Sequence, residues 1–229
     1  MSIKDKYRVE SIDSKETYEW LLHKHYLKRL VSISYAFGLF KDNVLIGVCT
    51  YGNALPSTMR RGFCGLKYEH IVYELNRLCV NEGLDRNILS YFVSKTFALI
   101  PKPKILVSYA DKEVGHTGYI YQATNWLFTG ESHTQLDWKV RGKEHIHSRT
   151  LMDEFSFEKD RIQKLKEKYG DDLYQVERIP KNRYVYFIGS KKQKKEMMNN
   201  LKYEIKPYPK GQNKRYDASY NPTIQTKLF

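Results

Sequence analysis

Four consecutive segments decide the fold of this chain: YELNRLCV at 73–80, ILSYFVSKTFALIP at 88–101, KILVSYAD at 104–111 and GHTGYIYQATNWLFTG at 115–130. Their lengths and apolar content predict strand, helix, strand and helix in that order. In α/β sheets, ligands bind beyond the carboxyl ends of the strands. The polar residues that end the second strand, Ser108 and Asp111, therefore mark the expected functional site.

The flanking segments extend this unit on both sides. Residues 14–30 predict a capped amphipathic helix, and residues 33–51 predict a β-hairpin. Residues 52–70 are rich in glycine, proline and basic side chains and predict a long loop, which is often a functional feature. We expect residues 1–155 to form one domain and residues 156–229 to form a basic C-terminal extension packed on the same domain.

The chain is strongly basic, with 39 Lys and Arg residues against 26 Asp and Glu residues and a formal charge of +13. Residues 159–229 hold 18 of the basic residues and only eight of the acidic ones. This segregation favours a polyanionic partner, and nucleic acid fits better than a membrane surface because basic side chains release its counterions. The chain has no apolar run near the roughly 18 residues of a membrane span, and its first ten residues lack the apolar core of a signal peptide. We therefore expect a cytosolic protein.

Two charged residues stand out on the predicted strands. Strict alternation would put Glu74 and Arg77 on opposite faces, with Leu75 and Cys79 beside the arginine. Such an arginine either forms a structural ion pair, with Glu74 or Asp111, or holds a phosphate or a catalytic carboxylate. Asp111 can act as a general base or bind a substrate amine, or it can simply cap the helix expected near residue 115.

Polar residues near the predicted helices also have two interpretations. Ser90 opens a helix, where unpaired N–H groups attract phosphate, although ordinary capping explains it equally well. Ser108 can contribute to a site or merely satisfy backbone groups. Gln122 and Asn125 lie three residues apart on the last predicted helix and can present one polar face, which suits an adenine edge.

The basic C-terminal part favours contact with nucleic acid. Its lysine cluster would contact phosphates and consists of Lys191, Lys192, Lys194 and Lys195. The tyrosines at 184, 186 and 203 would stack on bases or sugars. The alternative is a solvated face without a partner.

Six motifs together are more specific than any one of them: HYL at 25–27, SYAFGLF at 34–40, VLIGVCTYG at 44–52, ELNRL at 74–78, VSYAD at 107–111 and GHTGYIYQATNWLFTG at 115–130. In this combination the chain resembles the Mom family of phage DNA-modification proteins, over roughly residues 20–150. The resemblance implies an α+β fold like that of the GCN5-related N-acetyltransferases, with a mixed sheet flanked by helices. Residues 1–155 would then be the catalytic domain.

The resemblance also implies an enzyme. Mom proteins are transferases that convert the exocyclic amine of adenine in phage DNA to a carbamoylmethyl (acetamido) derivative, which shields the DNA from host restriction enzymes. The implied partner is double-stranded DNA, and the implied location is the cytoplasm of the infected or lysogenic bacterial host. The implied catalytic residues are His25, Tyr26, Arg77, Asp111 and Tyr121. The implied donor-binding residues are Arg77, Ser90 and Ser108, and Gln122 and Asn125 would face the substrate.

The group donor and the proton acceptor stay open. Enzymes of this fold cradle the pyrophosphate of coenzyme A with a glycine-containing run, whereas this chain reads DRNILS at 85–90. Acetyl-coenzyme A or another small acyl or glycyl donor is expected, although an acetyl group cannot supply the nitrogen of the product, and iron is a further option. Either His25 or Asp111 would take the amine proton. The number of subunits is also open, with a dimer as one option.

Adenine amines are paired inside a duplex, so an enzyme acting on them must extrude the base at a cost of about a few kcal/mol. The basic C-terminal part would supply compensating phosphate contacts, and Arg60 and Arg61 in the long loop would wedge or clamp the duplex. Two alternatives remain: an acetyl-coenzyme A-dependent N-acetyltransferase of the same fold acting on protein or RNA amines, and a DNA-binding protein without catalysis.

Overall fold

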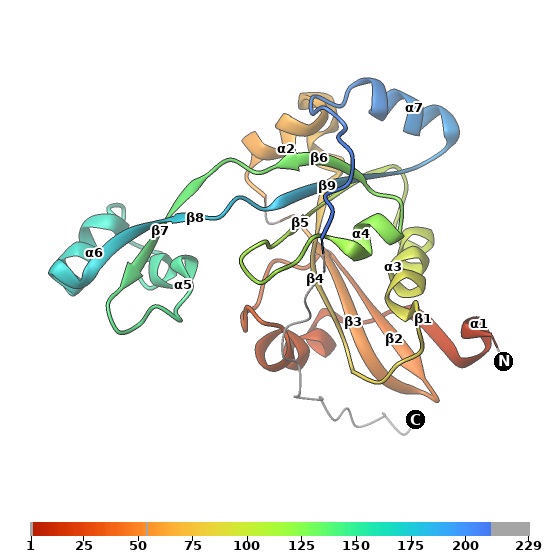
Figure 1. Ribbon diagram of the computed structural model, residues 1–229, viewed down its shortest axis with the longest axis horizontal. Helices are drawn as coiled ribbons and strands as arrows, with labels where there is room; N and C mark the ends of the chain where they lie inside the picture. The colour runs from red at the N-terminus through yellow and green to blue at the C-terminus, as the bar shows by residue number, and fades with distance from the viewer. Residues whose placement is uncertain (1, 54, 212–229) are drawn as a thin grey trace. The chain divides into compact units, whose positions relative to one another are not determined.

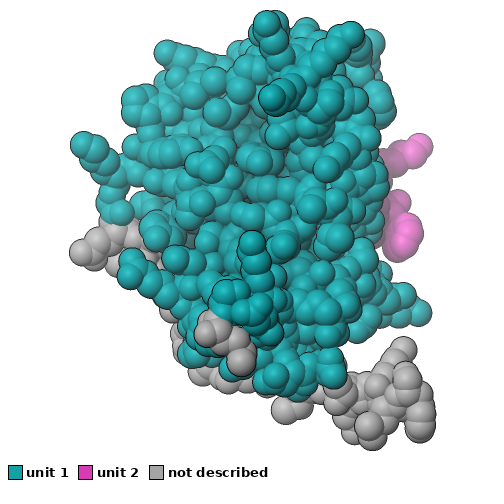
Figure 2. Space-filling view, turned by 90° about the vertical axis from the view of Figure 1, so that its right-hand side faces the viewer, with its two compact units in different colours: residues 1–131, 181–229 teal, residues 132–180 magenta. Residues whose placement is uncertain are grey.

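The computed structural model describes residues 2–53 and 55–211, which form two compact units (Figure 1). The main unit comprises residues 1–131 and 181–229, and the small unit comprises residues 132–180 (Figure 2). The boundary expected at residue 155 falls inside the small unit. The main unit continues after the small one because strand 182–188, within the expected C-terminal extension, pairs into the main sheet.

The main unit is built on a seven-stranded mixed sheet in the order β1-β2-β3-β4-β5-β9-β6. The strands are β1 (Tyr7–Ser11), β2 (Tyr35–Lys41), β3 (Val44–Gly52), β4 (Val72–Val80), β5 (Lys104–Ala110), β6 (Leu127–Glu131) and β9 (Asn182–Ile188). Neighbours are antiparallel except β4 and β5, which are parallel. A mixed, mostly antiparallel sheet with helices beside it confirms the predicted α+β class.

Helices cover both faces of this sheet. They are α1 (Ile3–Lys6), the 3-10 helices η1 (Ser14–Thr17) and η3 (Leu66–Ile71), the π-helix η2 (Trp20–Lys24), α2 (Ser57–Cys64), α3 (Ile88–Leu99), α4 (Tyr119–Ala123) and α7 (Lys191–Asn199). On one face, Phe92 of α3 packs with Leu106 of β5 in the largest core cluster. On the other face, Phe63 of α2 packs with Val107 and Phe187, while Trp20 of η2 packs with residues of β3 and β4.

The small unit is an antiparallel pair of strands with helices packed on it. Its elements are β7 (Gln135–Val140), β8 (Leu173–Arg178), α5 (Ser148–Asp153), α6 (Arg161–Tyr169) and the 3-10 turn η4 (Gly170–Asp172). Its core consists of Val140, Leu151 and Leu165. This unit has ten basic and ten acidic residues, whereas residues 181–229 have 12 basic and three acidic residues. The excess positive charge therefore belongs to the main unit.

Three sequence predictions differ from the observed elements. Residues 14–30 do not form one α-helix, because Asp13 and Glu16 form a capping box for a 3-10 turn that passes into the π-helix η2. The predicted long loop contains α2 and η3. The last predicted helix ends at Ala123, and Asn125 takes a left-handed φ of 61° before the chain enters β6. The hairpin and the elements β4, α3 and β5 are confirmed.

The face of Arg77 is also corrected. Arg77 lies opposite Thr50 of β3, whereas Leu75 lies opposite Tyr51. Residues that lie opposite each other on paired strands point to the same face, and the consecutive residues Thr50 and Tyr51 point to opposite faces. Leu75 and Arg77 therefore point to opposite faces of the sheet. The extra residue between them is a β-bulge. It returns Arg77 to the face of Glu74, where strict alternation had placed the two apart.

The ladder between β4 and β5 is short. It pairs Val72–Glu74 with Ile105–Val107 and then stops. Beyond it, β4 pairs with β3 and β5 pairs with β9. Two parallel strands therefore part in the middle of the sheet, and the bulge lies at the point where they part. Among the described residues, no helix is long and apolar enough to cross a membrane.

Candidate active site

Asp111, directly after β5, is the centre of one group of polar contacts. The residue is 6% exposed, and the Lys181 ammonium donates to its Oδ2 atom at 2.5 Å. The backbone N–H of Glu113 donates to Oδ1 at 3.1 Å, and the hydroxyl of Tyr26 also bonds to this side chain. Both carboxylate oxygens are therefore engaged. This geometry suits a residue that positions Tyr26 and Lys181 and caps a turn better than it suits a free proton acceptor.

His25 follows the π-helix η2 and is almost fully buried. Its ring stacks on Tyr26 with centroids 4.5 Å apart, and Tyr26 meets His116 edge-on at 5.9 Å. Burial lowers the pKa of His25 well below its usual value, and the nearby positive charge of Arg77 lowers it further. The Nδ1 atom accepts the backbone N–H of Leu27 at 3.1 Å, so the neutral ring carries its proton on Nε2. His25 is thus a hydrogen-bond donor here, and the expectation that it accepts the amine proton does not fit.

Arg77 is mostly buried beside these aromatic rings. Its Nη1 atom donates to the carbonyl of Asn76 at 2.6 Å, and its Nε atom has no hydrogen-bond partner within residues 2–53 and 55–211. Burial lowers the pKa of the guanidinium, while the neighbouring Tyr26 and Glu74 raise it. No ion pair joins Arg77 to Glu74 or to Asp111 among the described residues, contrary to the structural interpretation of this arginine. A buried guanidinium with a spare donor is suited to bind an anion.

Glu74 was missed as a site residue. It is the last β4 residue that pairs with β5, and the bulge places it on the face of Arg77. Burial raises the pKa of its carboxyl to about 7, against the opposing effect of the positive charges on Arg77 and Lys181. No described residue forms a hydrogen bond with this carboxyl. A carboxyl with a pKa near 7 and free oxygens is the best proton acceptor in the cluster.

Ser108 and Tyr121 meet on the other face of the sheet. Ser108 donates to the carbonyl of Leu75 at 2.8 Å and so bridges β5 to β4 where the two strands part. It also shares a 2.6 Å hydrogen bond with the hydroxyl of Tyr121 on α4. Burial raises the pKa of Tyr121, and the charge of Glu74 adds to this effect. Glu74 and Tyr121 therefore lie near enough for the charge of the one to act on the other, although they point to opposite faces of the sheet.

Other predicted residues lie outside this cluster. Ser90 donates to the carbonyl of Asn87 at the start of α3. Arg60 and Arg61 both bind Glu69, at 3.1 Å and 2.6 Å, so their charges are partly neutralised.

Residues of α4, α7 and β9 also lie outside this cluster. Gln122 donates to the hydroxyl of Tyr184 at 3.3 Å, and Asn125 is exposed in the turn after α4. The α7 lysines at 191, 192, 194 and 195 are all exposed. Tyr184 is fully buried, so the prediction that it stacks on a base is wrong.

The residues present fit an elongated donor with an anionic end. Beyond Glu74 and Val107 the strands β4 and β5 no longer pair with each other, and the Leu75 and Asn76 carbonyls accept side-chain hydrogen bonds instead. The α3 helix begins at Ile88 without a side-chain cap. The Ile88 N–H donates to the Asp85 carbonyl at 3.2 Å, and the other N–H groups of the first turn suit a phosphate. Among the described residues, no group of three or more His, Cys, Asp or Glu side chains is arranged to hold a metal ion.

The model of the Mom protein family matches residues 6–210. The chain belongs to the Mom protein family. The methylcarbamoylase Mom of Escherichia phage Mu is 29% identical over 210 residues, which cover 89% of this chain and 83% of that protein. The motifs HYL and VSYAD contain Tyr26 and Asp111, whose side chains form a hydrogen bond in the site.

Two solved structures are also similar to the chain. An N-acetyltransferase from Staphylococcus aureus Mu50 has a TM-score of 0.40 at 11% identity, covering 80% of this chain and 99% of that one. A Bacillus subtilis acetyltransferase in complex with CoA has a TM-score of 0.38 at 14% identity, covering 80% of this chain and all of that one. Neither likeness is close enough to decide the donor.

Proposed function

We propose that this enzyme of the Mom family transfers a carbamoylmethyl group to the exocyclic 6-amino group of adenine in phage DNA. The supporting observation is Glu74, a carboxyl with a raised pKa of about 7 that faces the same side as Arg77 where β4 and β5 part. Proton removal from a weakly basic aryl amine needs an acceptor with a pKa near neutrality. The membership of the family supplies the substrate.

In the proposed reaction, the adenine nitrogen forms a bond to the methylene carbon of an activated carbamoylmethyl donor. The leaving group of the donor departs with the bonding electron pair, and one N–H proton passes to Glu74. Arg77 binds the anionic part of the donor, because its Nε–H is buried without a partner in the described chain. Tyr26 and His25 orient the base, and Asp111 fixes Tyr26.

A donor of the acyl-coenzyme A type fits the uncapped start of α3 and the point where β4 and β5 part. Attack on the thioester carbon of such a donor would expel the thiolate and give an N-acyl adenine, so the carbamoylmethyl product requires a donor that carries its leaving group on the methylene carbon. Ser108 and Tyr121 would bind it from the α4 side, since their hydroxyls meet at the bridge between the strands. The amide nitrogen of the transferred group must already be part of that donor.

The positive charge of the main unit supports DNA binding as part of this proposal. The exposed α7 lysines would neutralise phosphates, and this electrostatic term offsets the cost of extruding a base. The α7 helix is favoured over Arg60 and Arg61, which bind Glu69. Acting in the host cytoplasm, the modification would protect phage DNA from restriction.

The test is mass spectrometry of deoxynucleosides from plasmid DNA of bacteria that express the chain. The proposal expects a heavier deoxyadenosine, with the mass of a carbamoylmethyl adduct, and resistance of the plasmid to restriction enzymes with adenine in their sites. An unmodified plasmid together with acetylated protein or RNA would instead identify an N-acetyltransferase.

DNA contact is tested with point variants of the α7 lysines in an electrophoretic shift assay. Deletion of residues 170–229 would be uninformative, because it removes β9 from between β5 and β6. Replacing Lys191, Lys192 and Lys195 by alanine should weaken duplex binding, and undiminished binding would refute the role of α7.

A further inference from the structure

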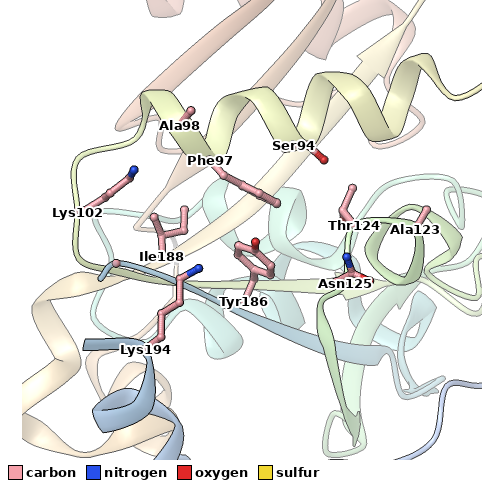
Figure 3. A pocket seen from close by; sticks show the side chains of 11 residues that line it. Ser94, Phe97, Ala98, Lys102, Ala123, Thr124, Asn125, Tyr186, Ile188 and Lys194 are labelled. Carbon is pink, nitrogen blue, oxygen red and sulfur yellow. The ribbon is translucent and has the colours of Figure 1, made fainter. Parts of the chain in front are cut away.

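A groove of about 360 Å³ lies away from the Glu74 cluster (Figure 3). Its wall comes from the C-terminal half of α3, the turn after α4, the end of β9 and α7. The residues that line it include Phe97, Lys102, Asn125, Tyr186 and Lys194. None of the candidate catalytic residues lines it. Its volume is within the range of small-ligand sites.

Aromatic rings form the middle of the groove. Phe97 of α3 stacks on Tyr186 of β9 with centroids 4.3 Å apart, and the buried Trp126 packs behind both. Phe97 and Tyr186 are only half-buried, so part of their surface faces the groove. The two rings come from a helix and a strand that pack against each other. A flat base can pack against such a wall in any sequence context.

The two ends of the groove differ in chemistry. Figure 3 shows Lys102 and Lys194 at one end and Asn125 at the other, with Tyr186 between them. Neither lysine forms an ion pair with any described residue, and the Lys194 Nζ atom lies 5.9 Å from the centroid of the Tyr186 ring. The Asn125 amide has no hydrogen-bond partner in the described chain. Two unpaired ammonium groups, an aromatic wall and a free amide are the groups that recognise a nucleotide.

The backbone of Asn125 supports a role for its side chain. Its φ of 61° is in the left-handed region, which glycine adopts without steric cost and asparagine tolerates. Glycine would satisfy the turn alone. Asparagine keeps the turn and adds an amide at the edge of the groove, which can bond to the donor and acceptor pair of adenine.

We propose that this groove binds one nucleotide, with its phosphate at Lys102 and Lys194 and its base against Phe97 and Tyr186 near Asn125. Only the source of the nucleotide rests on the proposed function: a strand of substrate DNA is expected rather than a free nucleotide. The groove would then hold a nucleotide distant from the reacting base and fix the position of the strand.

The proposal is tested by isothermal titration calorimetry on the full chain, with dAMP, inorganic phosphate and a ten-nucleotide single strand as ligands. The double variant Lys102→Ala/Lys194→Ala should weaken binding of dAMP and of the strand about tenfold or more. It should also reduce the salt dependence of strand binding by about two phosphate contacts. Asn125→Gly should weaken the binding of dAMP a few-fold and leave the affinity for inorganic phosphate unchanged.

The control Lys41→Ala/Lys95→Ala removes the same charge from lysines that do not line the groove, and it should bind dAMP as the wild type does. Competition then separates the two sources of the nucleotide. If the single strand displaces dAMP, the groove binds nucleic acid. If the strand leaves dAMP bound, the groove binds a free nucleotide. Equal losses in both double variants, or dAMP binding no tighter than phosphate, would overturn the proposal.

The Glu74→Gln variant separates this proposal from the proposed function. It should lose DNA modification and keep the dAMP affinity of the groove. If the wild type modifies no DNA while the groove variants lose dAMP binding, only the proposed function fails. If modification occurs and the groove variants bind dAMP normally, only the groove proposal fails.

Discussion

Each unit of the molecule places an arginine near a carboxylate, and the two arrangements are opposite. In the small unit, Arg178 binds Asp137 through two nitrogen atoms and also donates to Gln135 at 2.8 Å. Burial alone would raise the pKa of Asp137, but Arg178 outweighs it and lowers that pKa. In the main unit, Arg77 and Glu74 share a face without a bond, and the pKa of Glu74 is raised. The paired charges stabilise a fold, whereas the unpaired ones remain available for chemistry.

The largest expected effect is on catalysis. Glu74→Gln removes the proposed proton acceptor and should lower the rate of DNA modification by about 10²–10⁴-fold. Asp137→Asn is the same chemical change in the small unit, and it should alter the rate less than threefold. Quantitative nucleoside mass spectrometry over time measures both. Similar losses in the two variants would remove the distinction between the carboxylates.

Substitution of the two arginines should also affect activity only in the main unit. Arg77→Lys keeps the charge but loses the planar donor set, and we expect about a 10–100-fold loss in kcat/KM for the donor. Arg178→Lys should leave kcat/KM within threefold. Steady-state kinetics with purified protein and a short duplex give both values. Full activity of Arg77→Lys would show that a point charge suffices.

The two carboxylate variants should change the free energy of unfolding in opposite directions. The folded pKa of Glu74 lies above its unfolded value of 4.5, so its ionisation destabilises the fold as pH rises from about 4.5 to 7. Glu74→Gln should therefore gain about 3 kcal/mol at pH 8 and almost nothing near pH 4. Asp137→Asn should lose about 1–2 kcal/mol at pH 8, because it leaves Arg178 without its carboxylate. Urea unfolding at pH 4 and pH 8 measures these changes. A loss of stability in Glu74→Gln at pH 8 would contradict the conclusion that the wild-type Glu74 charge is buried.

The smallest effect concerns the hydroxyls on the other face. Tyr121→Phe breaks the hydrogen bond to Ser108 and should lower activity about three- to tenfold. It should also lower the free energy of unfolding by about 1 kcal/mol. Tyr184→Phe removes a comparable buried hydroxyl, which donates to the Thr117 carbonyl at 2.6 Å. It should cost similar stability without the loss of activity. Equal kinetic effects would assign Tyr121 to the core alone.

Local patterns predicted much of this fold. The hairpin, β4, α3 and β5 follow from periodicity, and the family motifs indicated Arg77, Asp111, Tyr26 and Tyr121. The bulge at Asn76 could not be predicted, because one inserted residue changes the face of every later one without changing composition. The insertion of β9 between β5 and β6 depends on a pairing across the whole small unit.

The missed site residues share a cause. Glu74 has a raised pKa because folding buries it, an effect that the charge of Arg77 offsets only in part, and the sequence alone showed a carboxylate suited to neutralise that arginine. The groove at Phe97 and Tyr186 joins two segments almost 90 positions apart. Neither feature has a local signature. Both follow from tertiary packing around residues whose types were visible from the start.

The most direct test of the central claim is the pH dependence of the modification rate. For the wild type, the rate should rise with pH and level off with an apparent pKa near 7, because Glu74 must be ionised to accept the proton. His25 is neutral across this range and should add no inflection. In Glu74→Gln the remaining rate should lose the inflection near 7. An unchanged profile in that variant, at an undiminished rate, would contradict the assignment of Glu74 as the proton acceptor.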